Sequence, residues 1–372
     1  MEKIDSSLFP KEAEEWVASG KMALGTVCCY LPEEIIHAAG ILPIRVRATS
    51  ALSDALGEVY YSSYSCPWAR TTLEQLMTHP GYKKLSGVYS SNGCMQAQRI
   101  YDISEFYDEE GRDYHLLNCP RKIDEDAVDF YKVEMEDMIA SVEKLASKTI
   151  TDDMLRKSVE VFNESRRLIK RMYEMRAVEK PTISGTEALE WTLASVTLPK
   201  EEFNKRMAAF LEEAATREPI EGHDVHVMLV GSPTDDPAFV KAIEDAGCLV
   251  VTDVTCFGSR TMWEEVELEG DIRDNLARMY LQRPACPRMI DNQRIMMETI
   301  SDMYKKSTAQ GIVYARMMNC DPWGAMRQYF DEYFTQNGIP YVELEREQVN
   351  INAGQVGVRI GALVEMLEEG EE

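Results

Sequence analysis

The sequence predicts an α/β protein with two doubly wound domains, mainly parallel sheets and a helical connector between them. Apolar strand-like segments alternate with helical segments in residues 1–126 and again in residues 223–372, the pattern of parallel sheets with helical crossovers. Residues 127–222 lack strand signals and repeat Glu, Lys, Met and Leu at helical spacing. With 372 residues, the chain is also long enough for two domains of ordinary size.

The first predicted domain begins with an amphipathic helix over Phe9–Met22. A second helix is predicted from Pro32 to Gly40, because proline suits a first helical turn and glycine can end a helix in a left-handed conformation. The remaining elements predicted here are strand Ile41–Val46, helix Ala69–Met77, strand Leu85–Ser91 and strand Tyr114–Asn118.

The second predicted domain alternates four strands with helices. Its predicted strands are His226–Gly231, Cys248–Val254, Gly311–Met317 and Pro340–Glu345, and its predicted helices are Phe239–Gly247, Gln293–Lys306 and Ala325–Gln336. Ligands of such sheets bind beyond the carboxyl ends of the strands. Cys94, Cys119, Cys256 and Cys320 all lie at or just after a predicted strand end.

Composition narrows the class of protein. The formal net charge of −24 disfavours binding to nucleic acid or anionic membranes, since both would be repelled. The N-terminal segment carries acids and no apolar core of a secretory signal, and no apolar run approaches the roughly 20 residues of a membrane span. We therefore expect a cytoplasmic protein whose nine cysteines are thiols or metal ligands and not a disulfide framework.

The cysteines are scattered along the chain. No CxxC pair occurs, which argues against zinc ribbons, thioredoxin-like sites and the tight ferredoxin spacing. Three cysteines stand where a helix is expected to begin. Cys66 precedes Pro67 in SSYSCPWAR, Cys94 follows Gly93 in SSNGCMQAQR, and Cys320 precedes Asp-Pro in MMNCDPWG.

A thiolate at a helix N-terminus is stabilised by the helix dipole and by free N–H groups. Soft thiolates in such positions suit an iron–sulfur cluster. Three cysteine ligands on a four-iron cluster would leave one iron open to a substrate oxygen or another ligand. The residues alone also leave open that these cysteines are merely small buried side chains.

Six motifs occur in an order that resembles a known family. They are GTVCCYLPEEIIHAAGILP, SCPWAR, SGVYSSNGCMQAQRIYD, VTDVTCFGSR, MNCDPWG and GVRIGALVEML. Together they look like the smaller, beta-type subunit (D-component) of the 2-hydroxyacyl-CoA dehydratase and benzoyl-CoA reductase family. The resemblance covers nearly the whole chain.

The resemblance implies a [4Fe–4S] cluster held between two α/β domains by Cys66, Cys94 and Cys320. It further implies a lyase subunit that pairs with a homologous alpha-type subunit, or with a second copy of itself, and acts on an acyl-CoA thioester. In the family, a separate ATP-dependent activator protein supplies one low-potential electron. That electron forms a ketyl radical from which the hydroxyl group is eliminated, a reaction of anaerobic metabolism.

Some features depart from this pattern. Cys94 is followed by Met95, where several family members have aspartate. The further cysteines Cys28, Cys29, Cys119, Cys256 and Cys286 exceed what a three-ligand cluster needs. A related branch uses additional cysteines to hold a double-cubane [8Fe–9S] cluster, so that cofactor stays open, as does reduction of an aromatic acyl-CoA. A third interpretation, from another class, is a non-enzymatic binding or assembly protein with buried cysteines.

Other candidate residues follow from position. Gly258, Ser259 and Arg260 come after a predicted strand end, where backbone N–H groups could meet an anion such as a CoA phosphate. Glu33, Glu34 and Arg70 are candidate catalytic residues, although the two glutamates also suit a helix start and Arg70 also suits surface pairing. Neither GxGxxG nor a Walker sequence is present, so ATP is expected on the activator and not on this chain.

Overall fold

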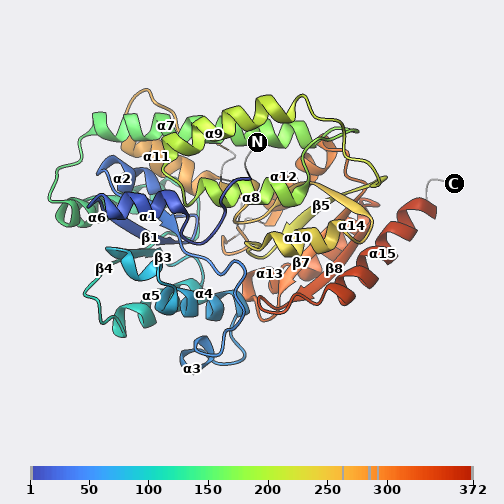
Figure 1. The fold of residues 1–372 in the computed structure, drawn as a ribbon, viewed down its shortest axis with the longest axis horizontal. Helices are drawn as coiled ribbons and strands as arrows, with labels where there is room; N and C mark the ends of the chain where they lie inside the picture. The colour runs from blue at the N-terminus through green and yellow to red at the C-terminus, as the bar shows by residue number, and fades with distance from the viewer. Residues whose placement is uncertain (1–2, 262–263, 284–285, 291–292, 370–372) are drawn as a thin grey trace.

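The computed structural model describes residues 3–261, 264–283, 286–290 and 293–369. Two four-stranded sheets, each with every strand parallel to its neighbours, are covered by helices (Figure 1). The α/β fold class predicted from the sequence is therefore confirmed.

The first sheet has the strand order β2-β1-β3-β4. Its strands are β1 (Ala23–Val27), β2 (Leu42–Arg45), β3 (Gly87–Ser91) and β4 (Asp113–Leu117). The sequence predicted the last three and missed β1, which is only five residues long and buried at every position. The strands β2 and β3 are equally buried, but β1 contains Ala23 and Gly25, residue types that are depleted in strands, so its strand signal is weaker.

The helices of this half are α1 (Lys11–Ala18), α2 (Glu33–Ala38), α3 (Gly57–Tyr60), α4 (Pro67–Thr78) and α5 (Met95–Phe106). Two of them differ from the prediction: α1 ends at Ala18 and not at Met22, and the short α3 was not predicted. Pro32 is the N-cap of α2, and Gly40 lies at φ +85° just after its end, as predicted. Glycine pays little for this left-handed conformation, which lets the chain turn into β2.

The second sheet has the order β6-β5-β7-β8. Its strands are β5 (Val225–Gly231), β6 (Cys248–Val254), β7 (Gly311–Met317) and β8 (Tyr341–Arg346). Its helices are α10 (Pro237–Glu244), α11 (Ile272–Gln282), α12 (Gln293–Lys306), α13 (Asp321–Ala325), α14 (Arg327–Gln336) and α15 (Ala353–Glu369). All four strands were predicted to within one residue, whereas the helices α11 and α15 were missed.

Four helices form the stretch that was predicted to be helical, and they lie over both sheets (Figure 1). They are α6 (Glu125–Ala146), α7 (Asp152–Arg176), α8 (Gly185–Ser195) and α9 (Lys200–Ala214). Asp124, Thr151 and Ser184 cap three of them, each accepting a hydrogen bond from a first-turn N–H. Helix α7 contacts α2, α9 and β6 and so ties the two halves together.

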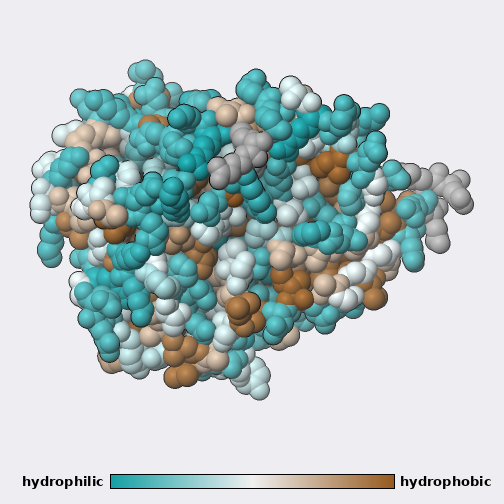
Figure 2. Space-filling model, in the orientation of Figure 1, coloured by the Kyte–Doolittle hydropathy of each residue, from teal (hydrophilic) through white to brown (hydrophobic). Residues whose placement is uncertain are grey.

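The cores also connect the halves. One buried apolar cluster joins β1 and β3 to β5, β6 and β7, and a second packs α11 against α6 and α2. The domain boundaries at residues 126 and 222 stay a prediction. The face in Figure 2 is mainly hydrophilic with scattered apolar patches. Among the described residues, no helix combines the length and apolar character needed to cross a membrane.

Candidate metal centre

A cavity of about 90 Å³ lies where the carboxyl ends of the two sheets face each other. Its walls come from the segments after β1, β3, β5, β6 and β7, the place where parallel sheets bind ligands. The cysteines that line it are Cys28, Cys29, Cys94, Cys256, Cys286 and Cys320. Six thiols around one small cavity are far more than chance burial of cysteine would place there.

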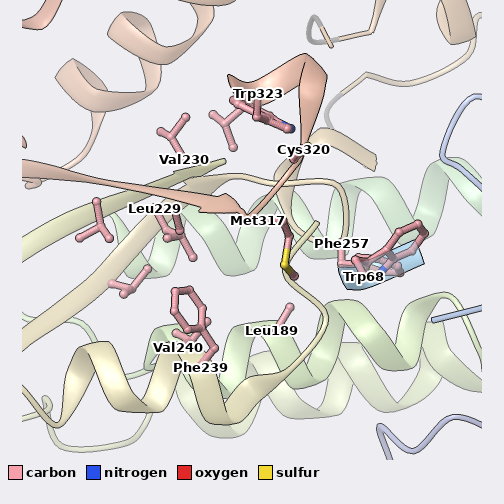
Figure 3. Packing of buried hydrophobic residues seen from close by; sticks show 14 of the residues in the cluster. Trp68, Leu189, Leu229, Val230, Phe239, Val240, Phe257, Met317, Cys320 and Trp323 are labelled. Carbon is pink, nitrogen blue, oxygen red and sulfur yellow. The ribbon is translucent and has the colours of Figure 1, made fainter. Parts of the chain in front are cut away.

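The three predicted ligands sit at equivalent positions in three elements. Cys66, Cys94 and Cys320 are the N-cap residues of α4, α5 and α13. The sulfur of Cys94 accepts a hydrogen bond from the Ala97 N–H at 3.4 Å. The expectation that each thiol stands at a helix start is thus confirmed. Figure 3 shows Cys320 just beyond the strand that carries Met317, near Trp323.

Cys66 and Cys320 form a pair across the two halves. The Cys66 thiol donates a hydrogen bond to Cys320, and this bond, together with burial, raises the pKa of Cys66 well above its usual value. The same bond lowers the pKa of Cys320 to about 7. Burial raises the pKa of Cys94 to about 11. The hydrogen bond thus favours the thiolate form at Cys320 over the other two thiols, which a bound metal would deprotonate.

A second group of thiols lies against the first. Cys29 accepts hydrogen bonds from Cys256 and Cys28, which hold its pKa well below the usual value. Cys28 has φ +77°, and its sulfur approaches Gly93 so closely that a Cβ on Gly93 would stand 2.5 Å away. The glycine before Cys94 thus makes room for Cys28, and the two thiol groups share one cavity.

Not every cysteine belongs to this site. Cys248, at the start of β6, donates to the Ile243 carbonyl at 3.4 Å and does not line the cavity. Burial raises its pKa to about 12, the behaviour of an inert packing residue. It offers a natural control position.

Buried arginines surround the thiols. Arg260 donates to the Cys256 sulfur at 3.0 Å, and Arg288 donates to the Cys119 sulfur at 3.2 Å. Arg283 donates to the Cys29 carbonyl, and Arg45 lines the cavity directly. No carboxylate of the described chain lines it. Such a site favours a negatively charged group, as a thiolate-ligated iron–sulfur cluster is.

The thiols are not arranged to grip a single ion. Within the described ranges, no group of three His, Cys, Asp or Glu side chains is close enough to ligate one metal ion. A cubane cluster needs its cysteines farther apart than a single ion does, because each cysteine binds a separate iron at a different corner. Soft sulfur donors, burial and surrounding guanidinium groups fit that cofactor.

The other predicted site residues lie outside the thiol cavity. Arg70 is buried in an ion pair with Asp54 at 2.9 Å and donates to the carbonyls of Ser63 and Ser65 at 2.9 Å each. It therefore fixes the loop that leads into Cys66.

The N–H groups of the loop predicted to bind an anion donate to other groups of the chain. The Ser259 N–H donates to the Asp253 carboxylate at 3.1 Å, and the Gly258 N–H to the Thr255 carbonyl at 3.3 Å. Arg260 points at Cys256, so this residue joins the thiol site while its two neighbours shape the turn.

Glu33 and Glu34 belong to a buried charged network behind the cavity. Glu33 accepts from Arg45 at 2.9 Å and from Thr26 at 2.9 Å. Glu34 accepts from Arg166 and, at 2.7 Å, from Tyr280. Burial would raise the pKa of Glu34, but Arg166 and Tyr280 hold it below its usual value.

Sequence patterns did not reveal Arg45, Arg283 or Arg288. Each stands in an ordinary apolar or polar context. Only the fold brings Arg45 and Arg288 to the cavity and Arg283 to the Cys29 carbonyl. The one available signal was Arg45 at the end of a predicted apolar strand, where an arginine is out of place unless it has a buried partner.

Comparison with known proteins gives a family match over most of the chain. Residues 28–367 match the family model described as 2-hydroxyglutaryl-CoA dehydratase, D-component. A benzoyl-CoA reductase subunit from Thauera aromatica is 26% identical over 88% of this chain and 85% of its own length. The (R)-phenyllactyl-CoA dehydratase beta subunit of Clostridium sporogenes is 26% identical over 94% and 92%.

The beta subunit of (R)-2-hydroxyglutaryl-CoA dehydratase of Acidaminococcus fermentans is 23% identical over 95% of this chain and 94% of its own length. The matches extend along nearly the entire chain, as the six motifs suggested. The chain therefore belongs to the family of the 2-hydroxyglutaryl-CoA dehydratase D-component.

Proposed function

We propose that the chain is the iron–sulfur subunit of a 2-hydroxyacyl-CoA dehydratase, holding a [4Fe–4S] cluster through Cys66, Cys94 and Cys320. The observations that support it best are the hydrogen-bonded pair of Cys66 and Cys320 from the two halves and the buried cavity beside this pair, which is lined by Cys94, Cys320, four further cysteines and two arginines. When bound, the cluster supplies single electrons at low potential.

The side chains of this chain provide the environment of the proposed cluster. The apolar side chains of Trp68, Phe257 and Trp323 line the cavity and exclude water, and the rings of Trp68 and Phe257 lie 6.3 Å apart (Figure 3). Arginines offset negative charge there. The homologous alpha-type subunit, or a second copy of this chain, would complete the acyl-CoA site, with electrons arriving from the ATP-dependent activator.

Iron and sulfide analysis of anaerobically purified protein tests the proposal. We expect about four irons per chain and broad visible absorption. Cys320→Ser should lose most of the iron, whereas Cys248→Ser should keep it. Equal iron in both variants, or an iron-free and colourless wild type, would contradict the proposal, and the colourless result would favour a binding or assembly protein.

The second thiol group favours one alternative cofactor, a double-cubane [8Fe–9S] cluster in a reductase. Cys28, Cys29, Cys256 and Cys286 line the same cavity as Cys94 and Cys320. About eight irons per chain, falling by half in Cys29→Ser, would support this cofactor. Four irons unaffected by Cys29→Ser would exclude it. Water loss from a 2-hydroxyacyl-CoA, measured against aromatic acyl-CoA reduction, separates the two reactions.

A further inference from the structure

Arg45 lines the thiol cavity with a guanidinium group whose hydrogen bonds are only partly satisfied. Its Nε and Nη2 both donate to Oε1 of Glu33, at 3.2 and 2.9 Å. Its Nη1 is buried and has no hydrogen-bond partner among the residues the structure describes. Leaving a buried donor unsatisfied is costly, and more so when the donor is charged, so such a donor is expected to meet a ligand.

The direction of that nitrogen is fixed by the fold. Arg45 ends β2, with its backbone N–H donating to the Val196 carbonyl at 2.9 Å. Glu33 is itself held by Thr26 at 2.9 Å, on the neighbouring strand β1. Because the guanidinium is planar, a carboxylate gripping one edge sets where the third nitrogen points.

The residues around Arg45 indicate which of two cavities its Nη1 faces. Arg45 lines the thiol cavity on one side and a smaller cavity of about 30 Å³ on the other. The smaller cavity already holds Lys200, Arg166 and Arg283, all cationic, with Glu33 as its lining carboxylate. Cationic neighbours repel a further donor. Glu33 is already bonded to the other edge of the guanidinium. After Glu33, the group that most raises the pKa of Arg45, against the effect of burial, is the Cys29 thiolate, which lines the thiol cavity.

We infer that Arg45 is a positioning residue that presents Nη1 to the group held by the thiols and makes that group easier to reduce. The inference rests on the proposed function. A cationic donor stabilises the extra negative charge of the reduced state, so it raises the reduction potential. The negative charge of Glu33 lowers the reduction potential, while its hydrogen bonds hold the Arg45 guanidinium in place.

This assignment predicts shifts of opposite sign in two variants. Arg45→Met removes charge and donor, and we expect a midpoint potential lower by about 59 mV or more, a tenfold change for a one-electron couple. Glu33→Gln removes a negative charge but keeps an amide oxygen for Arg45, and we expect a higher potential. A merely structural role would move both potentials in one direction or neither.

The measurement is a redox titration of anaerobically purified protein followed by electron paramagnetic resonance and visible absorption. Arg47→Met is the matched control, because Arg47 is likewise buried two residues away but donates to the Ser6 and Ser7 carbonyls, outside the cavity. Arg45→Gln, which also removes the positive charge, replaces Arg45→Met if the latter does not fold, with the same sign expected.

The possible results test the role of Arg45 separately from the proposed function. Normal iron with unshifted potentials in the Arg45 and Glu33 variants, or shifts of equal sign, would overturn the role of Arg45 and leave the proposed function standing. A wild-type protein without iron would overturn both. Opposite shifts, with Arg47→Met unchanged, would establish the assignment.

Discussion

At the scale of single residues, the most unusual feature is a lysine buried behind the thiol cavity. The Lys200 ammonium donates to the Ser195 carbonyl and lies 4.6 Å from the centre of the Phe162 ring. Glu33 and Glu34 attract it, and Arg45 and Arg166 repel it. Burial dominates and lowers the pKa of Lys200 to about 8.

This pKa predicts how stability depends on pH. In the unfolded chain Lys200 titrates near 10.4, so between pH 8 and 10.4 the folded protein binds fewer protons and its stability rises with pH. Relative to Lys200→Met, the wild type should gain about 2 kcal/mol of unfolding free energy between pH 7 and 9.5. Chemical denaturation of both proteins at the two pH values measures it.

Lys205→Met, on the exposed face of the same helix, controls for the substitution itself. A stability difference between wild type and Lys200→Met that is the same at pH 7 and pH 9.5 would show that Lys200 is not desolvated in the folded protein.

At the scale of elements, the end of β5 connects sheet pairing to the metal centre. Gly231 has φ +151°, and a Cβ there would stand 1.8 Å from the Ala315 carbonyl oxygen on β7. The next residue, Ser232, accepts from the Met317 N–H at 3.0 Å, and its hydroxyl helps to lower the pKa of Cys320. The position of Cys320 thus depends on a close approach of two backbones.

Gly231→Ala should therefore damage fold and site together. The clash is with backbone, so we expect a loss of about 3 kcal/mol or more in unfolding free energy and a loss of iron. Thermal denaturation and iron analysis measure the two effects. Gly357→Ala is the control, since that helical glycine of α15 has no atom within 4 Å of an added Cβ. Gly231→Ala with wild-type melting would contradict this account of β5.

The elements also show what sequence could predict. Seven of eight strands followed from apolar runs with Gly, Pro or Cys near one end. Cys66, Cys94 and Cys320 were expected at helix starts because a Gly or Pro lies within two residues of each. Strand β1 and helix α11 gave weak patterns. No short sequence pattern shows that Cys28 and Cys29 lie near Cys256. These cysteines come together only when the two sheets pack against each other, and the sequence carries no clear signal for that packing.

At the scale of the whole molecule, the candidate metal centre joins the two sheets. Its walls come from segments more than 200 residues apart, such as those around Cys94 and Cys320. A group bound by both segments stabilises only conformations in which the two sheets stay together. Binding should therefore couple the opening of one half to that of the other.

Hydrogen exchange compared between iron-loaded and iron-free protein can measure this coupling. We expect protection to rise together in residues 92–97, after β3, and in residues 318–323, after β7, because each segment carries a cysteine that we propose as a ligand to the same group. The segment around Cys248, at the opposite end of β6, should change far less. Protection that rises after only one of the two strands would mean that the iron is held by one half alone, and the sheets would then not share a cluster.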